Sequence, residues 1–186
     1  MAYRNGTYVA FHAGGTSNPI AAQSDIKYFN LLKAWHSNSH HVFRLIDSHD
    51  KVSSVRDTSK KKTLEQSLKN RLKLSKIMLL IITTNTKNDV DWVPFEISYA
   101  VDNCDIPIVA TYPDCNVPII NPIALGSYWP DALKRRIDNG TASVIHIPFS
   151  EAVIKDAINQ FGPNAKPLGA GLGYYSEDAY RSFGFI

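Results

Sequence analysis

The sequence predicts an α/β fold in three layers, with helices on both faces of a mostly parallel, five-stranded sheet. Two observations predict it. Short apolar runs of β type alternate along the chain with segments of helical spacing, which is the pattern of strands joined by crossover helices. One of these runs, IMLLII at residues 77–82, is apolar without interruption, as expected of a central strand that is buried on both faces.

The expected strands are the runs in which β-branched, aromatic and other apolar residues predominate. Polar or glycine-containing stretches follow the first three of them and can turn the chain toward a helix. The five runs are residues 8–12, 42–46, 77–83, 106–111 and 143–147.

Four segments have the apolar spacing of amphipathic helices, namely residues 25–35, 63–74, 92–103 and 150–161. In the second segment Leu64, Leu68 and Leu72 fall on one stripe, so this helix is expected to cover the sheet. Residues 112–129 contain several prolines and predict an irregular surface excursion, which a short helix follows at residues 130–138.

Alternating elements with short connections favour right-handed crossovers and a flavodoxin-like strand order of 2-1-3-4-5. One domain at residues 1–161 accounts for most of the 186 residues. Residues 162–186 form a C-terminal extension rich in Tyr and Phe, which we expect to be either flexible or docked. Its PLGAGLGYY segment does not fit the GxGxxG phosphate loop, because Tyr174 stands where the third glycine belongs and no strand precedes it.

The composition is that of an ordinary globular protein. Hydrophobic residues make up 44% and charged residues 20%, so neither disorder nor a disulfide scaffold is needed to explain the sequence. Cys104 and Cys115 lack CxxC spacing and neighbouring histidines, which predicts reduced thiols and no metal site. The sequence has neither a signal-peptide pattern nor an apolar run of membrane-spanning length, which predicts a cytoplasmic protein.

The net charge of +3 has a local origin. Between Lys51 and Lys76 there are nine Lys or Arg residues and only two acidic ones. Such a stretch can attract nucleic acid or a phosphorylated small molecule, but beside a helix it is more often a solvated face. We therefore expect no nucleic-acid partner.

Ligands of an open parallel sheet bind beyond the carboxyl ends of its strands, so the loops at that edge are the places to search. The first loop, HAGGTSN, begins with His12, which is either a ligand contact or a partly buried, satisfied histidine. The second, at residues 47–62, is long and polar and carries Arg56. The third contains Asn88, Asp89 and Asp91, any of which can cap the helix that follows.

Glu96 lies in the first or second turn of that helix. Its neighbours at helical spacing are Trp92, Val93, Tyr99 and Ala100, so the carboxylate shares the apolar face of the helix. This placement is unfavourable unless the carboxylate is paired or used, because desolvation disfavours the charged form. The spacing fits two roles equally. One is acid/base work or stabilisation of a developing cation, and the other is a structural Glu that accepts from a backbone N–H near the helix start.

Several segments together resemble a known family. They are YVAFHAGG at the end of the first strand, the polar loop after the second, the strand SKIMLLIIT, and WVPFEISYAV followed by IPIVAT. Over residues 5–160 the chain resembles the TIR-like domains of bacterial antiphage systems, most closely that of the Thoeris defence system. The most specific part is Trp92-x-x-x-Glu96, which matches the WxxxE pattern of catalytic TIR domains.

The resemblance implies an enzyme of the NAD glycohydrolase or ADP-ribosyl cyclase type, in which Glu96 is the catalytic residue that breaks the nicotinamide glycosidic bond. NAD is then the substrate, and neither a cofactor nor a metal is expected. Relatives are expected to send a cyclic ADP-ribose isomer to a separate NAD-consuming effector after phage infection. The family also implies TIR–TIR self-association, and the lack of an apolar run of membrane-spanning length predicts no membrane partner.

The remaining site residues follow from topology together with the resemblance. Arg56 is expected to meet the pyrophosphate. The residues expected to line or border the substrate pocket are Phe11, His12, Ala13, Trp92 and Asn85. Two other functions stay open at this point. One is a TIR scaffold or adaptor without catalysis. The other is an enzyme like the nucleoside deoxyribosyltransferases, which would act on free nucleosides.

Overall fold

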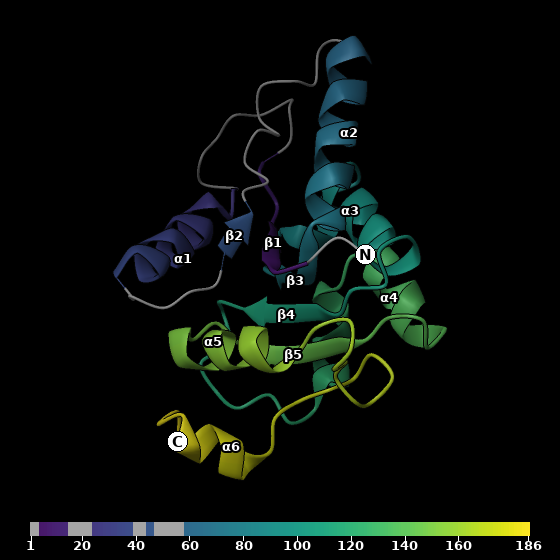
Figure 1. Cartoon of the computed structure of the whole chain (residues 1–186). Coiled ribbons are helices and arrows are strands. Elements are labelled where there is room, and N and C mark those ends of the chain that lie inside the picture. Colours follow the sequence, from purple (N-terminus) through teal and green to yellow (C-terminus); the bar gives the residue numbers. More distant parts are fainter. Residues whose placement is uncertain (1–3, 15–23, 39–43, 47–57) are drawn as a thin grey trace.

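The computed structural model describes residues 4–14, 24–38, 44–46 and 58–186 (Figure 1). Its sheet has five strands in the order β2-β1-β3-β4-β5, and all neighbouring pairs are parallel. The α/β class and the parallel sheet expected from the sequence are confirmed. The strands are β1 (Gly6–Ala10), β2 (Arg44–Ile46), β3 (Ser75–Ile81), β4 (Ile108–Tyr112) and β5 (Val144–Pro148).

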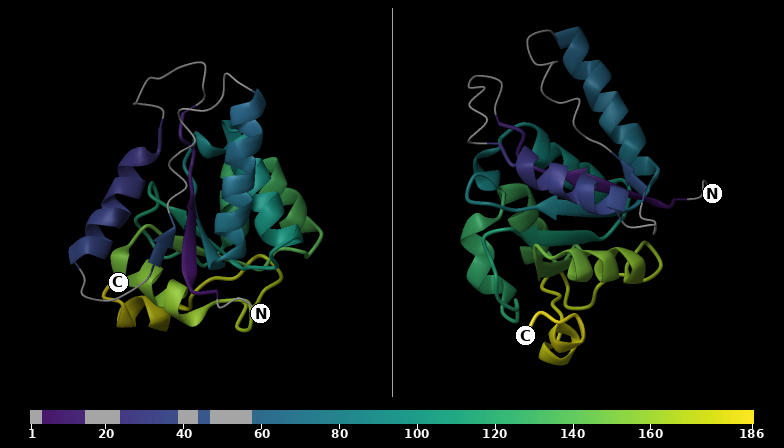
Figure 2. Two further views of the ribbon diagram at one scale, coloured as in Figure 1. Left: turned by 45° about the horizontal axis from the view of Figure 1, so that its top comes forward. Right: turned by 90° about the vertical axis from the view of Figure 1, so that its left-hand side faces the viewer.

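Helices cover both faces of the sheet (Figures 1 and 2). On one face the apolar core includes side chains of α2 (Thr58–Lys73), α3 (Trp92–Asp102) and α4 (Asp131–Asp138), and on the other it includes side chains of α1 (Ile26–Asn38) and α5 (Glu151–Gln160). Successive residues of a strand point to opposite faces. Tyr8 and Ala10 therefore join the α3 side, whereas Val9 and Phe11 join the α1 side.

Several element boundaries differ from those expected. β1 ends at Ala10, so Phe11 and His12 belong to the loop after it. α2 starts at Thr58, five residues before the first residue expected in it, because its first five residues, TSKKK, carry no apolar residue by which the helical spacing could be recognised. Part of the proline-rich excursion is regular, since the 3₁₀ helix η4 spans Pro122–Tyr128.

The C-terminal extension is docked on the sheet edge. The Gly173 N–H donates to Val144 O at 3.0 Å, and its carbonyl accepts from His146 N–H at 2.9 Å, which makes a parallel bridge beside β5. The last helix, α6 (Glu177–Ser182), follows this bridge, and Tyr180 within it is completely buried in the same apolar cluster as α1 and α5. The choice between a flexible and a docked extension is thus settled in favour of docking.

The glycine-rich segment of the extension has a structural role. Gly171 has a φ of +91°, and its carbonyl accepts from Nε2–H of the buried His146 at 2.9 Å. Because that carbonyl can only accept, Nδ1 of His146 is the acceptor for the Tyr112 hydroxyl at 2.7 Å. Trp129 Nε1–H donates in turn to Tyr112 at 2.8 Å. This chain of hydrogen bonds ties the extension to β4 and β5.

Among the residues that the structure describes, no helix combines the length and the apolar character needed to cross a bilayer.

Candidate active site

Glu96 lies in the second turn of α3 and is completely buried. The Tyr8 hydroxyl, from the middle of β1, donates a hydrogen bond to its Oε1. Tyr8 is also completely buried, so both groups are removed from water between the sheet and α3. A hydroxyl that donates to a carboxylate favours its charged form, which partly offsets the cost of burial. The sequence placed Glu96 on the apolar face of its helix, and the structure agrees.

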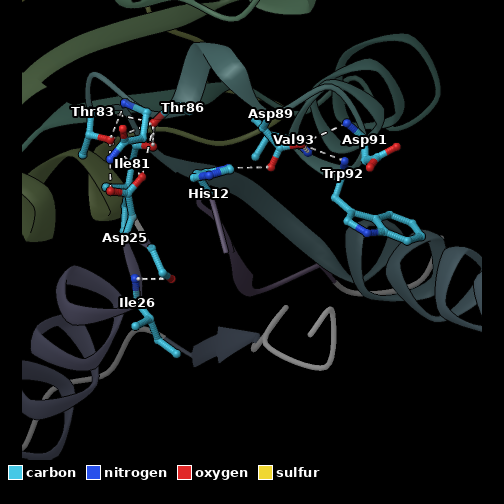
Figure 3. Close-up of polar contacts among 12 residues, drawn as sticks. His12, Asp25, Ile26, Ile81, Thr83, Thr86, Asp89, Asp91, Trp92 and Val93 are labelled. Carbon is cyan, nitrogen blue, oxygen red and sulfur yellow. Dashed lines mark hydrogen bonds and ion pairs between the residues drawn. The ribbon is translucent and has the colours of Figure 1, made fainter. Parts of the chain in front are cut away.

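The start of α3 is held by Asp89. Its Oδ1 accepts from the backbone N–H groups of Asp91, Trp92 and Val93 at 3.1, 3.0 and 3.3 Å (Figure 3). The expectation that an acidic or amide residue before Trp92 caps this helix is confirmed, and the residue is Asp89. Asp89 therefore accepts from backbone N–H groups at the start of the helix, which precede Glu96 in the sequence.

The second oxygen of Asp89 reaches across to the loop after β1. Its Oδ2 lies 3.1 Å from Nδ1 of His12, and the two side chains are only 10% and 13% exposed (Figure 3). Asp89 thereby joins the end of β1 to the start of α3. His12 is thus a partly buried histidine with a carboxylate partner, just beyond the carboxyl end of β1, and its contact with a ligand stays a prediction.

A second buried carboxyl group lies at this edge. Asp25, directly before α1, accepts from the Thr83 hydroxyl at 3.0 Å on both of its oxygens, and from the Thr86 hydroxyl at 3.4 Å (Figure 3). Its backbone N–H donates to His12 O at 2.9 Å. Burial raises the pKa of Asp25 to about 6, although the Thr83 hydrogen bond and the charge of His12 act in the opposite direction.

The sequence did not point to Asp25, Thr83 or Tyr8 as site residues. Asp25 was counted as the first residue of a helical segment, and a Tyr within an apolar strand is read as core. The proximity of Asp25 and Thr83 depends on the parallel pairing of β1 and β3. Ala10 lies beside Leu80, so the segments that follow the two strands leave the sheet at the same edge.

Replacing Asp25 by asparagine is expected to remove one pH dependence of stability. The pKa of Asp25 is about 6 in the folded protein and near 3.9 in an unfolded chain. At pH values between these two pKa values, Asp25 is more often protonated in the folded state than in the unfolded state. Its contribution to the free energy of unfolding therefore falls as the pH rises from about 4 to about 6. The shift corresponds to about 3 kcal/mol. Measured by urea unfolding, the variant should gain up to that amount over wild type between about pH 4 and pH 7.

His146 has the opposite effect on the pH dependence of stability, so the wild-type curve taken by itself does not reveal the contribution of Asp25. Burial lowers the pKa of His146 to about 4, so its contribution to stability is present above its unfolded pKa of 6.5 and is lost as the pH falls. Both proteins keep His146, and subtracting one stability curve from the other isolates Asp25. A difference that stays constant with pH would contradict the assignment.

The other residues expected at the site are only partly brought together. Trp92 is the first residue of α3, one turn before Glu96, and is 8% exposed. Asn85 precedes the 3₁₀ helix η3 (Thr86–Asn88) and donates its backbone N–H to the Thr83 hydroxyl at 3.2 Å. It thus borders the Asp25 cluster, whereas Glu96 is held by Tyr8.

Phe11 does not join Glu96. It is 1% exposed and stacks on Phe29 of α1, with ring centroids 5.0 Å apart, on the opposite face of the sheet from Tyr8 and Glu96. Ala13 packs against the cluster that contains Phe11. Arg56 lies outside the described residues. Within the described part of the chain, no group of three His, Cys, Asp or Glu side chains is arranged to hold a metal ion.

A comparison with protein families bears on this site. The family model for the Thoeris protein ThsB, TIR-like domain, matches residues 8–117 of the chain. The match covers more than half of the 186 residues. It begins at Tyr8 and includes His12, Asp25, Asp89 and Glu96, whereas η4, α4, β5, α5 and α6 lie beyond it.

Proposed function

Because this chain belongs to the TIR-like family of the Thoeris protein ThsB, we propose that it is an antiphage defence enzyme that converts NAD into a nucleotide signal. The observation that carries the proposal is the carboxylate of Glu96, fully buried on an apolar helix face and supported by the Tyr8 hydroxyl. It occupies the last position of the WxxxE pattern that begins at Trp92. NAD is the substrate in this account, and no further cofactor is required.

Cleavage of the nicotinamide glycosidic bond is helped by one negative charge placed beside the ribose carbon that reacts. When the bond between nicotinamide and ribose breaks, nicotinamide leaves as a neutral molecule and the ribose carbon takes on oxocarbenium character. A carboxylate fixed beside that carbon stabilises the developing cation, and it does so most effectively where water is excluded. Glu96 lies among the apolar side chains of the α3 side of the sheet, so a ribose that reached it after an opening of this region would meet it in surroundings poor in water, which supports this role.

The identity of the product depends on which nucleophile reaches the ribose carbon. Water gives ADP-ribose, whereas an adenine nitrogen of the same NAD molecule gives a cyclic isomer. A site that excludes water favours the internal nucleophile over hydrolysis. We therefore expect the cyclic ADP-ribose isomer, which would diffuse to a separate NAD-consuming effector of the same defence system.

The burial of Glu96 also supports a requirement for activation. A ribose cannot contact a carboxylate that has no accessible surface, so the region around Glu96 must open before NAD can react. Infection is the expected trigger, and TIR–TIR self-association is one way to supply the opening. His12, Trp92 and Asn85 remain our proposed substrate contacts in the opened form.

Phe11, Ala13 and Arg56 are not proposed to contact the ribose beside Glu96. Phe11 and Ala13 pack on the α1 side of the sheet, so they would shape the first loop from behind and not touch the ribose beside Glu96. For Arg56 and its neighbouring lysines, contact with the pyrophosphate stays a proposal based on charge.

A filtrate-transfer experiment tests the proposed function. Cells that carry this protein without its effector are infected, lysed and passed through a filter that retains proteins, and the filtrate is added to separately purified effector. We expect the effector to consume NAD only with filtrate from infected cells that carry the protein, and heating the filtrate should not abolish this. If the unfiltered lysate activates the effector but the filtrate does not, signalling occurs by protein contact and the proposal is wrong.

A further inference from the structure

A cavity of about 330 Å³ lies at the carboxyl ends of β3 and β4. Ile82 and Thr83 follow β3, Tyr112 ends β4, and Leu125 and Tyr128 belong to η4. Open parallel sheets bind their ligands at this edge. The volume is at the lower end of the range for small-molecule pockets, roughly 300 to 1,000 Å³. It suits a compound of the size of a nucleobase or nucleoside and is small for a dinucleotide.

Two tyrosines, Tyr112 and Tyr128, and the aliphatic residues Ile82, Val117 and Leu125 belong to the lining. The ring of Tyr112 is held in place, because its hydroxyl accepts from Trp129 Nε1–H and donates to Nδ1 of His146. Tyr128 is half-buried and belongs to the wall that η4 contributes. Aromatic walls of this kind favour a flat ligand that can stack on a ring.

The charges at the cavity are negative. Asp114 and Asn116 are exposed residues of the lining, and among the residues that the structure describes the lining contains no Lys, Arg or His. Thr83, a buried residue of the lining, donates its hydroxyl to the buried Asp25, on which the charge of Asp114 also acts. Phosphate groups are therefore repelled, whereas an N–H donor finds an acceptor in the Asp114 carboxylate or the Asn116 amide oxygen.

We propose that this cavity binds a neutral, flat nitrogen heterocycle bearing an amino or carboxamide group, and that it discriminates against phosphorylated nucleotides. Nucleosides and nicotinamide share this chemistry. The inference stands on the residues of this cavity and does not depend on Glu96 or on the proposed function. It adds a site for an uncharged ligand next to the Asp25 cluster.

Isothermal titration calorimetry of the purified full-length protein tests the proposal with adenosine, nicotinamide and AMP as probes. Adenosine or nicotinamide is expected to bind with a Kd of about 1 mM or lower, and AMP at least about tenfold more weakly than adenosine. Tighter binding of adenosine assigns the site to nucleosides, and tighter binding of nicotinamide assigns it to carboxamides. The proposal is overturned if neither probe binds in this range, or if AMP binds as tightly as adenosine.

Variants locate the binding within the molecule. Tyr128→Ala is expected to weaken the better probe at least about tenfold by removing one stacking surface. The matched control is Tyr174→Ala, because Tyr174 is a half-exposed tyrosine of the C-terminal extension and should leave affinity unchanged. Asp114→Asn changes an exposed side chain and should narrow the gap between adenosine and AMP. Thermal unfolding checks that each variant is folded, and unchanged affinities in both Tyr128→Ala and Asp114→Asn would overturn the proposal.

Discussion

Replacing Glu96 by glutamine is expected to abolish protection against phage in cells that also carry the effector. Glutamine keeps the size of the side chain and an oxygen that can accept from the Tyr8 hydroxyl, so the fold should persist. It lacks the negative charge that stabilises a ribose cation, and loss of one such electrostatic group lowers turnover about a hundredfold or more. Efficiency of plating should return to that of cells without the defence system.

The control for this variant is Glu151→Gln, which makes the same chemical change at an exposed position in the first turn of α5. Full protection is expected from it. Protection that survives Glu96→Gln, in a variant shown to be folded by circular dichroism and urea unfolding, would contradict catalysis by Glu96. That result would favour the alternative of a TIR scaffold.

Gly173→Ala is expected to destabilise the protein by about 3 kcal/mol, toward the upper end of the range for overpacking. A Cβ at this position would lie 2.7 Å from Leu168 O and 2.7 Å from Val144 O. Both contacts are with backbone atoms, so no side-chain rotation relieves them. The bridge to β5 must open, which removes the hydrogen bonds that Gly173 makes with Val144 and His146. Urea unfolding with a constant m-value measures the loss.

Gly162→Ala is the matched control within the same extension. The nearest atom to a Cβ there is Lys76 Cδ at 3.9 Å, an ordinary contact, and Gly162 does not have a positive φ. We expect a change within about 0.5 kcal/mol. Equal effects of the two substitutions would show that the bridge at Gly173 does not hold the extension in place.

The alternation of apolar runs with helical spacing was sufficient to predict the layers and the parallel sheet, because each pattern reports burial within one local element. The ends of elements were less accurate. The apolar run at the end of β1 continues through Phe11, but the ladder with β3 stops at Ala10. The docked extension could not be predicted, because Gly173 and Tyr180 contribute to a core that is assembled from residues distant in sequence.

The candidate site was predictable where one helix carried the information. Glu96 and Trp92 are one turn apart, so their shared face follows from helical spacing. The partner of Glu96 was not predictable, since Tyr8 approaches it from a strand 88 positions away. For Phe11 a local signal existed. Both Phe11 and His12 were expected in the first strand, and adjacent strand residues face opposite sides of a sheet. This alternation indicates that the two side chains do not line the same pocket.

Mass spectrometry of small molecules tests directly whether Glu96 converts NAD in infected cells. Filtered lysates are compared from infected cells that carry either the unaltered protein or Glu96→Gln, both without the effector. We predict additional free nicotinamide and a new nucleotide, lighter than ADP-ribose by one water, with the unaltered protein only. If both folded proteins give the same nucleotides, Glu96 does not convert NAD in response to infection, and the proposed function is wrong.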